Sequence, residues 1–75
     1  MSREIPNNLS DKAASFPESS YGVNRVTLVL GDGRKVNEVY LAWGKEIVKI
    51  RNRSIKSMED LNFDITKIVD VISEI

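Results

Sequence analysis

The sequence predicts a small, mainly β domain built on a three-stranded antiparallel meander. Apolar residues alternate with other residues along NRVTLVL and again along KVNEVYLAW, which is the pattern of half-buried strands. Gly31-Asp32-Gly33 separates these two segments and Gly44-Lys45 follows the second, and both contain residue pairs that form tight hairpin turns. These observations predict strands at about 23–31, 34–43 and 46–51.

The first turn determines how the first two strands pair. Asp32-Gly33 suits a two-residue type I′ loop, which needs positive φ at both central positions. That loop pairs Val26 with Val39 and, on the opposite face, Arg25 with Tyr40. It also predicts the pairs Leu28 with Asn37, Leu30 with Lys35, Thr27 with Glu38 and Val29 with Val36. One face then collects the apolar residues Val26, Leu28, Leu30, Val39, Leu41 and Trp43.

The second turn supports the same buried face. Gly44-Lys45 suits a two-residue type II′ loop, in which glycine takes the first central position. This loop pairs Leu41 with Val48 and Tyr40 with Lys49. Val39 then meets Ile50, and Glu38 meets Arg51. A slip of one residue would turn a whole strand over, so the agreement of two turns favours this meander. The second face is half polar, because it also carries Val29, Val36, Ala42 and Ile47.

The C-terminal segment is compatible with two structures. Its β-branched residues favour one helical turn near Asp64–Lys67 and then a strand at about 68–74, which would close a small, partly open barrel. The alternative is a helix over 61–74 packed on the sheet, because several apolar residues also fall at helical spacing. Ser57 with Asp60 could begin such a helix as a variant of a capping box.

The first 20 residues are expected to form a mostly irregular arm before a single domain at 21–75. They are rich in serine and asparagine, contain Pro6 and Pro17, and show no sustained period. Ile5, Leu9 and Phe16 are too apolar for a purely solvated tail. We therefore expect parts of this arm to lie against the domain.

Composition argues against several functional classes. The chain has no cysteine and no histidine, which removes disulfides, thiolate chemistry and nucleophilic catalysis of the Ser-His-Asp or Cys-His type. Gly31-Asp32-Gly33 lacks the ending of a phosphate-binding loop, and the spacing of Glu59, Asp60 and Asp64 is not that of a calcium-binding loop. No apolar run is long enough to span a membrane, and no secretory leader is visible. We expect a cytoplasmic protein that is not an enzyme and has no metal, no cofactor and no membrane partner.

Charge is distributed unevenly, although the net charge is +0. Residues 45–56 are basic and residues 57–75 are acidic, and the two blocks could face each other within the fold. The predicted register brings basic and aromatic residues together on the second face of the meander. The candidate partner-binding residues there are Arg25, Tyr40, Lys49, Arg51 and Arg53.

Two interpretations of this face remain open. An aromatic ring flanked by cations can bind single-stranded nucleic acid, but zero net charge disfavours a polyanionic partner. A cross-strand ladder of cation–π contacts and ion pairs would serve solubility alone. We therefore expect a small non-enzymatic interaction module that binds a protein or itself, with weak nucleic-acid binding as the alternative. A homodimer is expected because chains of this size often depend on oligomerisation.

Overall fold

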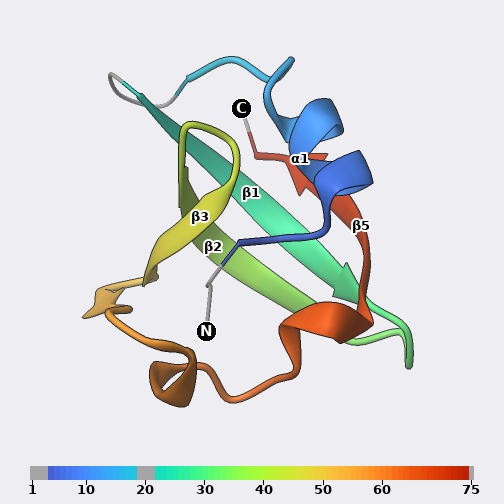
Figure 1. The fold of residues 1–75 in the computed structure, drawn as a ribbon, viewed down its shortest axis with the longest axis vertical. Coiled ribbons are helices and arrows are strands. Elements are labelled where there is room, and N and C mark those ends of the chain that lie inside the picture. The colour runs from blue at the N-terminus through green and yellow to red at the C-terminus, as the bar shows by residue number, and fades with distance from the viewer. Residues whose placement is uncertain (1–3, 19–21, 75) are drawn as a thin grey trace.

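A computed structural model describes residues 4–18 and 22–74 of the chain. In this part of the protein, five antiparallel strands form one sheet, which is not closed into a barrel (Figure 1). Their order in the sheet is β4-β3-β2-β1-β5. The strands are β1 (Val23–Leu30), β2 (Lys35–Ala42), β3 (Glu46–Ile50), β4 (Arg53–Ser54) and β5 (Ile68–Ser73). The expected meander and the C-terminal strand are confirmed.

The alternative of a helix over 61–74 is wrong. Two short 3₁₀ turns, η1 (Met58–Asp60) and η2 (Ile65–Lys67), precede β5, and only η2 lies within residues 61–74. The Asp64 carboxylate caps this turn by accepting hydrogen bonds from the Thr66 N–H at 2.9 Å and from the Thr66 hydroxyl at 2.6 Å. The β-branched residues that follow then adopt the extended conformation that suits them, and β5 pairs with β1.

The β1–β2 turn contains three residues rather than the two predicted. Leu30 donates to the Arg34 carbonyl at 2.8 Å, so Gly31, Asp32 and Gly33 all lie in the loop. Gly33 has φ of 93°, the left-handed conformation that the last position of a three-residue hairpin loop requires. The additional loop residue shifts the pairing between the end of β1 and the start of β2 by one residue. The pairs near the turn are therefore Leu28 with Val36 and Val29 with Lys35, not those predicted.

A β-bulge restores the predicted register farther along the hairpin. The shift lies between Val26 and Leu28 of β1, opposite Glu38, which has φ of 56°. Beyond this bulge Val26 pairs with Val39 and Arg25 with Tyr40, as predicted. Because turn and bulge compensate, the buried face keeps its apolar residues. Val36, which was expected on the second face, packs against the core instead.

The β2–β3 corner lies at Trp43-Gly44 and not at Gly44-Lys45. Both residues have positive φ, 57° and 72°, and Lys45 donates to the Ala42 carbonyl at 3.0 Å, which is the geometry of a type I′ turn. Tyr40 still pairs with Lys49 as predicted, but a second irregularity follows it.

Three predictions near this corner are therefore wrong. Leu41 pairs with Ile47 and not with Val48. Ile47, expected on the second face, is fully buried in the core. Trp43, expected on the apolar face, is 68% exposed because the corner turns its side chain outward.

The N-terminal segment contributes to the core more than its sequence suggests. Residues expected to be irregular form helix α1 (Asn7–Ala13), which lies against β5 (Figure 1). Ile5, Leu9 and Ala13 are buried. The Ile5 N–H donates to the Lys45 carbonyl at 3.0 Å, which ties this segment to the β2–β3 corner. The expected boundary between arm and domain, at residues 20 and 21, lies outside the described residues.

One apolar cluster fills the space between the sheet and the segments that cover it. Its covering residues come from α1 and its approach and from the connection between β4 and β5. The buried members outside the meander are Ile5, Leu9, Ala13, Ile55, Ile65, Ile68 and Val71. Over the described residues, no helix has the length and apolar character needed to cross a membrane.

Candidate functional site

The predicted row of basic and aromatic residues on the second face is present. Arg25, Tyr40 and Lys49 are directly opposite one another on β1, β2 and β3. The Lys49 ammonium lies 5.4 Å from the centroid of the Tyr40 ring. This is a cation–π contact, and it places a cation where a stacked base would have to lie. The Lys49 ammonium and the Tyr40 ring therefore already interact with each other within the protein.

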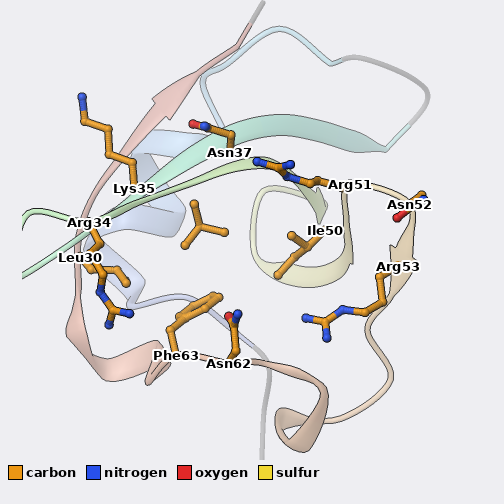
Figure 2. A pocket seen from close by; sticks show the side chains of 11 residues that line it. Leu30, Arg34, Lys35, Asn37, Ile50, Arg51, Asn52, Arg53, Asn62 and Phe63 are labelled. Carbon is orange, nitrogen blue, oxygen red and sulfur yellow. The ribbon is translucent and has the colours of Figure 1, made fainter.

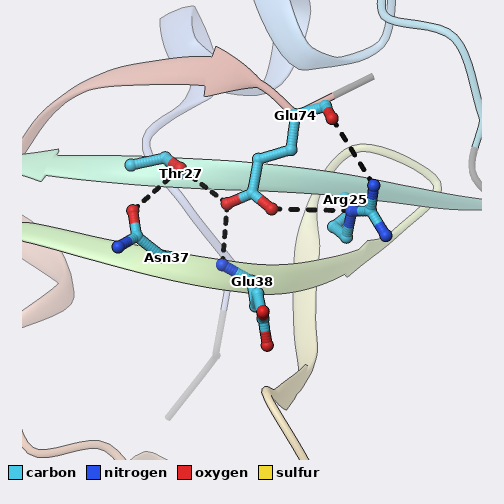
Figure 3. Close-up of polar contacts among 5 residues, drawn as sticks. All are labelled: Arg25, Thr27, Asn37, Glu38 and Glu74. Carbon is cyan, nitrogen blue, oxygen red and sulfur yellow. Dashed lines mark hydrogen bonds and ion pairs between the residues drawn. The ribbon is translucent and has the colours of Figure 1, made fainter.

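Arg25 is likewise engaged inside the fold, through Glu74 (Figure 3). Its Nε lies 3.5 Å from Glu74 Oε1, and its Nη2 donates to the Glu74 carbonyl at 3.5 Å. The second carboxylate oxygen of Glu74 accepts from the Thr27 hydroxyl at 2.6 Å and from the Glu38 N–H at 2.7 Å. Glu74 thus joins the end of β5 to both β1 and β2, and it offsets the charge that Arg25 would offer to a partner.

Arg51 and Arg53 leave this row and line an open pocket at one end of the sheet (Figure 2). Ile50 pairs with Arg53 across a two-residue corner of Arg51 and Asn52, where Arg51 has φ of 57°. The pocket has a volume of about 460 Å³. Its lining comes from the β1–β2 turn, the start of β2, the β3–β4 corner and the loop before η2: Leu30, Arg34, Lys35, Val36, Asn37, Ile50, Arg51, Asn52, Arg53, Asn62 and Phe63.

The pocket combines an apolar floor with a cationic rim. Val36 and Phe63 are half-buried and pack against the core. The Arg34 and Arg53 side chains approach Phe63 from opposite sides, with Asn62 beside the ring (Figure 2). The Lys35 side chain points away from them (Figure 2). Among the described residues that line the pocket, none carries a carboxylate. The pocket therefore favours a ligand that has both negative charge and apolar surface.

A carboxylate pairs with Arg34, and the charge of a second carboxylate, Asp60, is near Arg53. Arg34 Nε donates to Asp32 Oδ2 at 2.7 Å, a contact that does not involve the Nη groups. The hydrogen bond from the Arg34 N–H, followed by the bond and charge of its guanidinium, holds the pKa of Asp32 below its usual 3.8. The pKa of Asp60 is lowered mainly by hydrogen bonds from the Lys56 and Ser57 N–H groups, and further by the nearby charge of Arg53. The positive charge of each arginine is therefore partly offset, and this lowers the affinity of the pocket for anions.

Sequence reasoning identified only part of this pocket. It selected Arg51 and Arg53 as members of the second face of the meander, but missed Arg34, Asn62 and Phe63. These residues come from segments that are far apart in the sequence, and their approach depends on the path of the β4–β5 connection. The position of Arg34 directly after a hairpin turn was the one local signal.

A metal site has no support in the described residues. No group of three or more acidic side chains there is placed to hold a metal ion. Comparisons with protein-family models, with curated proteins and with solved structures find no match for this chain.

Proposed function

We propose that this chain is a non-enzymatic interaction module that binds an acidic segment of a partner protein through the pocket. The observation that carries this proposal is the approach of Arg34 and Arg53 to an apolar floor from opposite sides, with no carboxylate in the described lining. Arginine suits this role because its planar guanidinium can pair with a carboxylate through two parallel hydrogen bonds. We further propose that the protein acts in the cytoplasm.

Self-association is one form of the same proposal. Residues 57–75 of this chain are acidic and could supply the segment that a second copy binds. Light scattering over a wide concentration range tests this form. A mass that doubles as concentration rises supports a homodimer, whereas a constant monomer mass restricts the proposal to a different partner.

Weak nucleic-acid binding is the second candidate, and one observation favours it. Figure 2 shows Arg34 on one side of Phe63 and, beyond Asn62, Arg53 on the other, and an aromatic ring near cations can stack a base while the cations meet phosphates. The net charge of +0, the ion pair of Arg34 with Asp32 and the negative charge of Asp60 near Arg53 count against it.

Amide-resolved NMR titration at low salt tests the proposal, with a glutamate-rich peptide and a single-stranded oligonucleotide as separate probes. We expect the peptide to shift the amides of Val36, Ile50, Asn62 and Phe63, while the Arg25 and Lys49 amides remain in place. The shifts should weaken as salt is added, because exposed charges are screened. If neither probe moves the pocket amides at low salt, the pocket is not a binding site.

A further inference from the structure

The pocket contains two separate features that one ligand can satisfy together. Its floor offers aliphatic and aromatic surface from Val36, Ile50 and Phe63, at the edge of the core. Its charges do not lie on that floor. Two of the charged side chains approach it from two sides, Arg34 from the β1–β2 turn and Arg53 from β4 (Figure 2). A ligand with charge alone would leave the apolar floor exposed to water.

The floor is better matched to an apolar side chain than to a nucleic-acid base. Leu30, Val36 and Ile50 are aliphatic, and the one aromatic ring of the lining is partly covered by its packing against the core. Bases bind on open aromatic platforms, usually with further rings along the strand. The ring of Tyr40, on β2, is already in contact with the Lys49 ammonium. A leucine-sized side chain would gain from leaving water in this pocket.

The two-sided placement of the arginines also restricts where acidic groups should stand in a partner. In an extended peptide, residues at alternate positions point to the same side of the chain. If an apolar side chain enters the pocket, its immediate neighbours point away from the floor. The residues two positions before and two positions after it point toward the rim.

Resting on the function proposed above, we propose that the pocket recognises an extended protein segment with a central apolar residue and acidic residues two positions away on each side. The apolar side chain occupies the floor between Val36, Ile50 and Phe63. One carboxylate pairs with Arg34 and the other with Arg53. The Asn62 side chain, beside the ring, provides an amide group that can hydrogen-bond to the peptide backbone.

Labelled peptides with the core Glu-Ser-Leu-Ser-Glu, titrated into the full chain by fluorescence anisotropy, test this inference. Three matched peptides accompany them: one with serine in place of leucine, one with both glutamates replaced by glutamine, and one reordered as Ser-Glu-Leu-Glu-Ser. We expect loss of the leucine to weaken binding about tenfold. We expect the reordered peptide, which has the same composition, to bind about fivefold more weakly because its carboxylates point away from the rim.

Protein variants test the residue assignments. Arg34→Gln and Arg53→Gln should each weaken binding of the alternating peptide about fivefold, whereas Lys45→Gln, the matched loss of a positive charge at the β2–β3 corner, outside the pocket lining, should leave it unchanged. Phe63→Leu should retain peptide binding within about twofold, because an aliphatic floor remains. The same variant should abolish oligonucleotide binding if a base stacks on the ring. Urea midpoints of all variants establish that they are folded.

The outcomes separate this inference from the function on which it rests. If all glutamate-containing peptides bind equally, the pocket binds acidic segments but the inferred pattern is wrong. If the oligonucleotide binds more tightly than every peptide and Phe63→Leu removes that binding, the partner is nucleic acid. If no probe binds, both the inference and the proposed function fail.

Discussion

Among the described residues, three other than glycine have left-handed backbone conformations, and the first two mark points where the meander departs from its predicted register. They are Glu38, Trp43 and Arg51, with φ of 56°, 57° and 57°. This conformation brings the Cβ of an L-residue close to the following carbonyl and costs about 1–2 kcal/mol. Glu38 has an identifiable compensation, because its N–H donates to the Glu74 carboxylate at 2.7 Å.

Arg51 lines the pocket, and its replacement tests whether its left-handed conformation lowers the stability of the fold. We expect Arg51→Gly to raise the free energy of unfolding by about 0.5–1 kcal/mol, because glycine relieves the strain but adds freedom to the unfolded chain. Arg53→Gly is the control. It lies in β4, outside the residues with positive φ, and should lower stability by about 0.5–1 kcal/mol. Urea titration measures both, and equal losses in the two variants would show that Arg51 is not strained.

At the scale of elements, polar contacts join α1 to β5 and the end of β5 to the meander. Lys12 of α1 forms an ion pair with Asp70 of β5 at 2.6 Å, and Asp70 also accepts from the Val71 N–H at 2.8 Å. The second contact occupies a main-chain donor of an outermost strand, which lowers its tendency to pair with another chain. Glu74 then joins the end of β5 to β1 and β2.

The approach of α1 to the β2–β3 corner can be tested with two glycine variants. A Cβ at Gly44 would lie 3.0 Å from the Ala14 nitrogen and 3.1 Å from its Cα, whereas a Cβ at Gly33 would meet nothing within 4 Å. Both glycines have positive φ. Gly33→Ala should therefore cost only the strain, about 1–2 kcal/mol.

We expect Gly44→Ala to cost more than Gly33→Ala, because it adds a backbone clash that displaces the end of α1. Urea titration gives the two free energies of unfolding. Hydrogen exchange at Ser10 and Ala14 should accelerate in Gly44→Ala alone. Equal costs, with α1 equally protected in both variants, would contradict the close packing of helix and corner.

For the whole molecule, we expect the free energy of unfolding to depend on pH in the acidic range because of four aspartates. Hydrogen bonds to their carboxylates lower the pKa of Asp32, Asp60, Asp64 and Asp70 below the usual 3.8. A carboxyl group with a lower pKa in the folded state stabilises the fold when it is ionised, above its unfolded pKa. That contribution disappears as the pH falls through the lowered folded value.

We therefore expect the urea midpoint to be constant from about pH 7 to about pH 5 and to fall once the pH drops below 3.8. Asp64→Ala should reduce this acid dependence, because its carboxylate bonds to both the N–H and the hydroxyl of Thr66. A midpoint that rises on acidification would contradict these pKa directions.

The sequence alone determined the class of fold, the bounds of the main strands and the central pairing of Val26 with Val39 and Tyr40 with Lys49. Alternating polarity and glycine-containing turns are local signals, and they act over the few residues that a hairpin joins. Burial of one face then allows few registers. At the C-terminus the β-branched residues favoured a strand, but the apolar spacing also fitted a helix, and the pairing of β5 with β1 decides between them.

Only the tertiary structure decided the length of each corner, the bulges, helix α1 and the pocket. A three-residue loop and a bulge compensate each other, so the apolar pattern is the same with or without them. Helix α1 is too short to be stable without its packing on β5, and short isolated helices leave little periodic signal. Arg34, Arg53 and Phe63 come together because a long connection folds back across the end of the sheet, and that path depends on contacts between distant residues.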